Sequence, residues 1–156
     1  MTIQEFGDYA KIIGLILTVS SILLGVAYFI INLKRDRAKQ TLDYWEKINQ
    51  QLKAGKWLLL KDYGTKIDSK MAQLILEDDD QQIAINRVIN IYERLALGVN
   101  IKAYDIQVLN KLVGQNIIDN YARFEAYIEA RRTKLDRPYA WREFQKLSER
   151  LDKIRK

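Results

Sequence analysis

Residues 12–33 read IIGLILTVSSILLGVAYFIINL, a run of 22 positions without one charged side chain. An α-helix rises about 1.5 Å per residue, so this run is about 33 Å long, enough to cross the hydrocarbon core of a bilayer. A cleaved signal peptide has a shorter apolar region, a basic N-terminal flank and small residues at its end. Here Glu5 and Asp8 precede the run, and Lys34 and Arg35 follow it. The stretch therefore predicts a transmembrane helix.

The basic residues that flank this stretch predict its orientation. Lys11 is the only one before it, whereas Lys34, Arg35, Arg37 and Lys39 follow directly. Because Lys and Arg concentrate on the cytoplasmic side of membrane proteins, we expect the C-terminal side in the cytoplasm. The basic cluster also attracts anionic headgroups, which makes the lipid bilayer an expected partner. The sequence thus predicts a single-pass protein of the bacterial inner membrane, N-terminus outside, with an external segment 1–11, a transmembrane helix 12–33 and a cytoplasmic domain 34–156.

Small and polar side chains form one stripe along the predicted transmembrane helix. Its members alternate in spacing between four and three residues, which places them on one helix face. Apolar surface does not drive helices together in lipid, so association needs close packing and hydrogen bonds. The stripe favours a homo-oligomer, although a single-pass anchor also tolerates Gly and Ser at any position. Its residues are Gly14, Thr18, Ser21, Gly25, Tyr28 and Asn32.

The side chains that most often carry catalysis are missing from the sequence. It has no Cys and no His, so a thiolate nucleophile, a disulfide and the commonest general base are excluded. Glycine-rich phosphate loops and nucleophile motifs such as GxSxG are also absent. The acidic run 77–80 lacks the spacing of a calcium loop and favours helix capping instead. We therefore expect a protein that is not an enzyme and holds no metal and no cofactor.

Residues 34–156 predict an all-α domain of five or six helices. Apolar residues recur there with a helical period, and the whole chain has one Pro. The first of these helices can continue directly from the transmembrane helix. The expected helices cover about 35–53, 69–76, 82–97, 106–113 and 115–134, and the last one starts at Asp136-Arg137-Pro138.

Capping residues and glycines predict where these helices begin and end. We expect Asp79 or Asp80 to cap the helix 82–97 and Asp105 to cap the next one. Gly98 and Gly114 are expected to end helices, since glycine readily takes the left-handed conformation found there. A turn is expected at 63–65. The residues expected to face inward on the shorter helices are Met71, Leu74, Ile75, Ile106, Leu109, Leu112, Trp141, Phe144, Leu147, Leu151 and Ile154.

The segment from Asn86 to Arg150 resembles a bacterial domain family of unknown function, DUF4760. The upstream layout, a membrane helix followed by basic residues and Thr41-Leu42, is similar as well. The resemblance implies a membrane-tethered helical domain. It is carried by Asn90-Ile91-Tyr92-Glu93-Arg94-Leu95-Ala96, Gly98, Asp105, Gly114, Tyr121, Tyr127-Ile128-Glu129, Arg131, Arg132, Pro138, Phe144 and Leu147-Ser148-Glu149-Arg150.

A second resemblance concerns the overall plan and has no residue motif. Small CRISPR-associated membrane effectors join an N-terminal membrane part to a basic cytoplasmic domain that binds a cyclic oligoadenylate. This chain is similar in plan, because residues 34–156 hold 25 basic and 18 acidic side chains, a net charge of +7. The resemblance implies a role in antiviral defence.

The positive charge of residues 34–156 has three interpretations. It reflects solvated helix faces near an anionic leaflet, a site for an anionic ligand, or a surface for a protein partner. Arginine forks match phosphate oxygens, and aromatic rings stack on bases. The candidate ligand-binding residues are Arg87, Asn90 and Arg94, which share a helix face, and Arg123, Arg131, Arg132, Lys134, Arg137 and Tyr139.

Two functions remain open. The favoured one is a membrane effector or sensor whose cytoplasmic domain binds an anionic nucleotide signal, with a cyclic oligonucleotide as the candidate ligand. The membrane helices would respond as an oligomer. The alternative is a membrane-tethered adaptor that binds a protein partner and no small ligand. We expect no long nucleic acid as a partner in either case.

Overall fold

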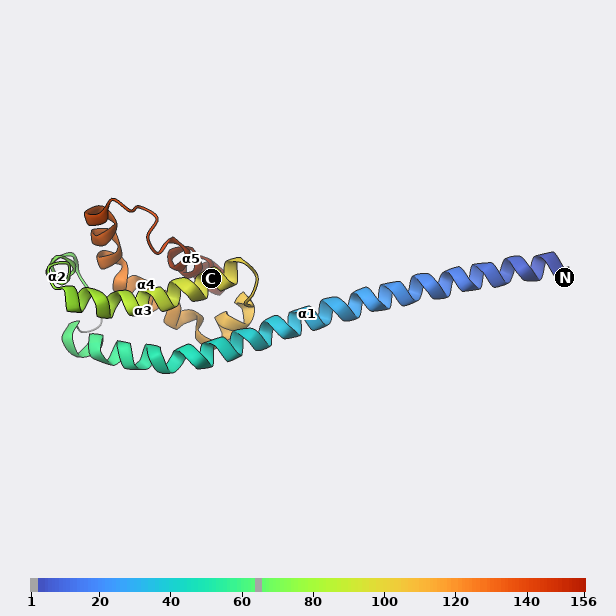
Figure 1. Cartoon of the computed structure of the whole chain (residues 1–156), viewed down its shortest axis with the longest axis horizontal. Coiled ribbons are helices and arrows are strands. Elements are labelled where there is room, and N and C mark those ends of the chain that lie inside the picture. Colours follow the sequence, from blue (N-terminus) through green and yellow to red (C-terminus); the bar gives the residue numbers. More distant parts are fainter. Residues whose placement is uncertain (1–2, 64–65) are drawn as a thin grey trace. The chain divides into compact units, whose positions relative to one another are not determined.

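The computed structural model describes the backbone of residues 3–63 and 66–156 and the side chains of residues 7, 11–53 and 66–156. Within these residues the chain is all-α, as predicted. It divides into two compact units, residues 1–36 and residues 37–156, which are described separately. The five helices are α1 (Ile3–Tyr63), α2 (Ser69–Ile75), α3 (Asp79–Asn100), α4 (Ile106–Leu135) and α5 (Arg142–Arg155) (Figure 1). Gly64 and Thr65 of the expected turn lie outside the described residues.

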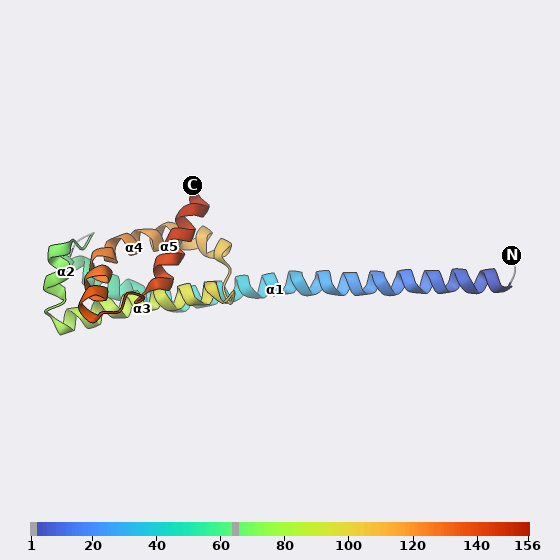
Figure 2. The same cartoon turned by 90° about the horizontal axis from the view of Figure 1, so that it is seen from above.

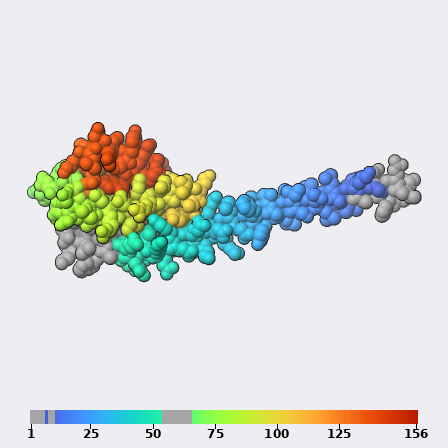
Figure 3. All heavy atoms as spheres, viewed as in Figure 1, coloured from blue at the N-terminus to red at the C-terminus, as the bar shows by residue number. Residues whose placement is uncertain are grey.

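The first unit consists of the N-terminal part of α1. Its side chains from residue 11 to residue 31 are all exposed (Figure 3). By length and composition this part of α1 could cross a membrane. The Thr18 hydroxyl donates to the Gly14 carbonyl oxygen at 2.8 Å. This bond within the helix gives the hydroxyl a hydrogen-bond partner, which the hydrocarbon chains of a lipid cannot provide.

The core of the second unit lies where α3, α4 and α5 meet. Figure 2 shows α5 crossing between α3 and α4, and α5 contacts both of them. The Phe144 ring of α5 stacks on Tyr92 of α3, with ring centroids 4.8 Å apart. It also meets Tyr121 of α4 edge-on, at 5.3 Å. Tyr121 and Phe144 are both buried, so the aromatic side chains join all three helices in one core.

The C-terminal part of α1 belongs to this core as well. Ile48 and Leu52 are buried in it. Thr41 is fully buried and polar, and its hydroxyl donates to the Arg37 carbonyl oxygen at 2.7 Å. The Thr41 hydroxyl oxygen in turn accepts the amide N–H of Asp105 at 2.8 Å. A single hydroxyl therefore links α1 to the α3–α4 loop.

Two glycines lie inside helices where helix ends were expected. Gly98 does not end its helix, because α3 continues to Asn100. The residue that takes the left-handed conformation after the helix is Lys102, with φ 61°. Gly98 is instead buried beneath Tyr104: a Cβ there would lie 2.1 Å from that ring. Gly114 does not separate two helices either, since α4 runs unbroken past it. The Tyr104 ring occupies the space that a side chain at Gly98 would take, and the Asn110 and Arg155 side chains occupy that space at Gly114, which no local pattern reveals.

Other predicted boundaries and inward faces also need correction. The cap of α3 is Asp78, whose side chain accepts the Gln81 N–H, and not Asp79 or Asp80. Pro138 lies in the turn before α5 and not in its first turn. The side chains of Leu74, Leu112 and Ile154 are 59%, 43% and 40% exposed, and do not face the core. Asp105 does cap α4, as predicted.

Candidate ligand-binding site

Arg87, Asn90 and Arg94 lie together in a groove of about 380 Å³ beside α1. All three side chains are exposed on α3. The other lining residues are Gln51 of α1 and Ile83, Asn86 and Ile91 of α3. None of the described residues that line this groove carries a carboxylate, so the two guanidinium groups meet no counter-charge within it.

The charge of Arg94 also acts on Tyr44 of α1, which lies outside the groove lining. Burial raises the pKa of the Tyr44 phenol, while the positive charge of Arg94 opposes this shift. Tyr44 also stacks on Tyr104, with ring centroids 4.8 Å apart. The described lining of the groove thus consists of polar, basic and apolar side chains of α3 together with Gln51 of α1.

A second groove of about 410 Å³ adjoins the first and shares Asn86 and Asn90 with it. Both amides are held in place. Asn90 Oδ1 accepts the Trp141 indole N–H at 2.8 Å, and Asn86 Oδ1 accepts the Tyr127 hydroxyl at 2.9 Å. The second groove also contains a carboxylate, so it is less suited to an anion. Its other residues are Glu93, Arg131, Leu135, Arg137, Ala140 and Trp141.

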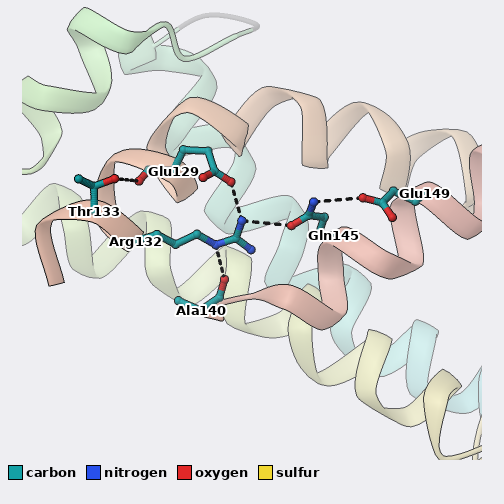
Figure 4. Close-up of polar contacts among 6 residues, drawn as sticks. All are labelled: Glu129, Arg132, Thr133, Ala140, Gln145 and Glu149. Atoms are coloured by element: carbon teal, nitrogen blue, oxygen red, sulfur yellow. Dashed lines mark hydrogen bonds and ion pairs between the residues drawn. The ribbon is translucent and has the colours of Figure 1, made fainter. Parts of the chain in front are cut away.

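Arg132 fastens the α4–α5 loop, as Figure 4 shows. Its side chain is only 10% exposed. Its Nε donates to the Ala140 carbonyl oxygen at 2.9 Å, and its Nη1 bonds Gln145 Oε1 at 3.1 Å and Glu129 Oε1. The Nε and Nη1 donors are therefore used within the fold, while Nη2 is buried without a hydrogen-bond partner among the described residues.

Arg131 and Lys134 are engaged in the same way. Arg131 donates to the Gln82 side chain of α3. The Lys134 ammonium group donates at 2.5 Å to the Leu76 carbonyl oxygen beyond the end of α2, which also accepts Gln82 Nε2 at 3.2 Å. These two cations tie α4 to its neighbours, which leaves fewer of their donors for a ligand.

The remaining candidates do not join the first groove. Arg123 is partly buried near Tyr92, and its charge opposes the rise in phenol pKa that burial causes there. Tyr139 is 71% exposed, and the Arg142 guanidinium lies 5.1 Å from its ring centroid. The nine predicted residues thus divide among several surfaces, and only Arg87, Asn90 and Arg94 form a carboxylate-free set.

Sequence reasoning missed the roles of Thr41 and Glu93. Thr41 has no signal of its own, because a buried threonine in a helix looks like any other. Glu93 accepts the backbone N–H groups of Glu143 and Phe144 at the start of α5. The sequence did contain an indication of this capping. No capping Ser, Thr, Asp or Asn stands directly before α5, so the first N–H groups of α5 need an acceptor from another part of the chain.

The second unit is thus a helical domain with a basic groove, and α1, whose C-terminal part belongs to this domain, is apolar enough in its N-terminal part to span a membrane. The model of the domain of unknown function DUF4760 matches residues 10–151. The chain therefore belongs to this family, which confirms the resemblance noted in residues 86–150. No curated protein and no solved structure matches the chain.

Proposed function

We propose that the chain is a single-pass membrane sensor whose cytoplasmic domain binds an anionic nucleotide signal. In this proposal residues 12–33 cross the bacterial inner membrane with the N-terminus outside. The observation that carries it is the groove of Arg87, Asn90 and Arg94 beside α1, whose described lining holds no carboxylate. The protein acts by binding and by a response of its membrane helices, without catalysis.

The groove offers the contacts that a nucleotide needs. Two guanidinium groups provide paired donors for phosphate oxygens, and such bonds are stronger than those between neutral groups. Asn86 and Asn90 add amide groups, and Ile83 and Ile91 add apolar surface against which a base packs. Cyclic oligoadenylates combine repeated phosphates with bases, so they are the first ligands to test, and antiviral defence is the corresponding biological role.

The position of the groove supports a response in α1. Gln51 of α1 lines the groove, and Thr41 of the same helix bonds the α3–α4 loop. A ligand that binds one arrangement of these contacts better than another shifts the population toward it. Since α1 begins at Ile3 and ends at Tyr63, the helix that borders the groove also contains the proposed membrane span.

Oligomerisation would strengthen binding of a symmetric ligand. The stripe of Gly14, Thr18, Ser21, Gly25, Tyr28 and Asn32 is exposed or half-exposed along one helix and is proposed as the contact between copies. In a tetramer, Arg94 would supply four guanidinium groups around one polyanion. Substitution of Gly25 with Leu is expected to lower the oligomeric mass of the protein in detergent, because it blocks close approach of the helices.

The test measures the melting temperature of the full chain in lipid nanodiscs with cyclic oligoadenylates and cyclic dinucleotides, at two salt concentrations. We expect one of them to stabilise the protein, and more so at low salt, because binding to the folded state raises its stability. Arg94→Ala and Arg87→Ala should remove this effect. Lys153→Ala, a change of the same kind at an exposed position outside the groove, should leave it intact.

The alternative is the membrane-tethered adaptor. Leu97 and Ile101, four residues apart near the end of α3, are 51% and 68% exposed, which suits a protein partner. If no nucleotide shifts the melting temperature of a protein that is well folded, the sensor is contradicted and the adaptor is favoured. Capture of a partner that Leu97→Ser and Ile101→Ser abolish would then identify the adaptor surface.

A further inference from the structure

A third groove, of about 550 Å³, lies between α1, α4 and α5. It shares no residue with the Arg87 groove, and the inference drawn from it does not rest on the proposed function. Its volume falls within the range of small-molecule sites. The lining residues are Trp45, Asn49, Leu52, Lys53, Asn110, Lys111, Leu112, Val113, Gly114, Gln115, Asn116 and Arg155.

The charge of this groove is entirely positive in its described lining. Lys53, Lys111 and Arg155 come from three different helices and converge there. The other polar side chains that line it are amides, which donate and accept hydrogen bonds without adding charge. Three cations in one groove, with no carboxylate among its described lining residues, repel one another, and a bound anion relieves that repulsion.

Arg155 lies close to the backbone of α4 at Gly114, on one side of the groove. The Arg155 Nη1 group donates to Asn110 Oδ1 at 3.1 Å, which holds the guanidinium against α4. A Cβ at Gly114 would lie 2.3 Å from Asn110 Oδ1 and 3.3 Å from Arg155 Nη1. The glycine leaves room for this pair close to the helix backbone, and a methyl group there would displace the ends of these two side chains.

The aromatic and apolar residues decide the class of ligand. Trp45 is half-buried against the core and lines the groove, together with Leu52, Leu112 and Val113. A groove that combines cations with an indole and apolar side chains fits a molecule with a phosphate at one end and a flat ring at the other. We propose that this groove binds a nucleoside phosphate, with the phosphate at Lys111 and Arg155 and the base against Trp45.

The test is isothermal titration of the full chain in nanodiscs with three probes. AMP carries both groups, ribose 5-phosphate lacks the base, and adenosine lacks the phosphate. We expect AMP to bind more tightly than either part. Arg155→Gln and Lys111→Gln should weaken AMP binding at least tenfold. Trp45→Leu should weaken AMP binding but leave ribose 5-phosphate unchanged, and Trp45→Tyr should largely restore AMP binding.

Controls separate this site from the other groove and from misfolding. The double variant Arg87→Gln, Arg94→Gln should bind AMP as the unchanged chain does. Each variant is compared by its circular dichroism and melting temperature. The proposal is overturned if AMP does not bind the folded chain. It is also overturned if the Arg87 and Arg94 substitutions weaken AMP binding and Arg155→Gln does not. Neither result bears on binding of cyclic oligonucleotides at the Arg87 groove.

Discussion

Glu93 of α3 caps α5: its Oε2 atom accepts the backbone N–H of Phe144 at 2.7 Å, and its Oε1 atom accepts that of Glu143 at 3.3 Å. The N-cap position of α5 is Trp141, in the left-handed conformation with φ 53°. An indole has no acceptor, so Trp141 cannot cap the helix itself. A carboxylate from another helix satisfies the free N–H groups and faces the positive end of the helix dipole.

Substitution of Glu93 with Ala is expected to lower the free energy of unfolding by about 1 kcal/mol, the usual value of a helix cap. Burial raises the pKa of Glu93, against the opposing effect of the two backbone bonds. The folded state thus holds the proton more tightly than the unfolded state. Stability from this group is greatest at low pH and falls as pH rises from the ordinary carboxyl range through the raised pKa.

The check is thermal unfolding of the unchanged chain and of Glu93→Ala across this pH range. The difference in stability between them should shrink as pH rises. Gln107→Ala, which removes an exposed side chain without a titratable group, is the control and should show no such trend. A difference that grows with pH would contradict the raised pKa.

Substitution of Thr41 with Val removes the hydroxyl that accepts the Asp105 N–H and keeps the shape of the side chain. The Asp105 amide then loses its partner, which costs about 1 to 3 kcal/mol. Thr41→Ser keeps the hydroxyl and should cost less. Hydrogen exchange measured by mass spectrometry should show faster exchange in the peptide that contains Asp105 for Thr41→Val only. Equal exchange in the two variants would show that the hydroxyl does not hold the loop.

Substitution of Gly98 with Ala should destabilise the second unit by about 1 to 3 kcal/mol, because the added methyl group overlaps the Tyr104 ring. The higher helix propensity of Ala, about 1 kcal/mol, opposes this only in part. In a Tyr104→Ala background the clash is absent, so the same substitution should be neutral or stabilising. A double-mutant cycle measured by thermal unfolding tests this sign change.

Substitution of Arg132 with Lys should loosen the α4–α5 loop. Lysine has one terminal nitrogen and cannot donate from separate Nε and Nη1 positions to Ala140 and Gln145, as Arg132 does. We expect a loss of about 1 to 3 kcal/mol and faster proteolysis between residues 136 and 141. Arg137→Lys, at an exposed position in the same loop, should leave both unchanged. If the Arg132→Lys variant resists proteolysis as well as the unchanged chain does, the guanidinium group is not what holds the loop in place.

Local pattern was sufficient for the fold class and for much of the core. Helical periodicity depends on neighbours three and four residues apart, so Ile85, Val88 and Tyr92 could be placed on the buried face of α3 from the sequence, and all three are buried. The Asp105 cap was predictable for the same reason, since its partners lie two and three residues ahead. The face that carries Arg87, Asn90 and Arg94 is also a local property of one helix.

The site needed the tertiary structure, because its properties depend on residues far apart in the sequence. Nothing near Arg132 in the sequence indicates that its guanidinium is used by the loop that follows. The groove at Lys53, Lys111 and Arg155 brings together cations separated by more than forty positions.

The sequence by itself determined an apolar N-terminal helix, an all-α domain and a basic face on α3, because these follow from side-chain chemistry and short-range hydrogen bonding. Only the tertiary structure decided why Gly98 and Gly114 are glycines, what caps α5, and which cations remain available to a ligand. Those properties arise from packing between helices, where one added methyl group or one lost acceptor changes the stability of the fold. Local propensity depends on neighbours in the sequence and therefore does not predict such contacts.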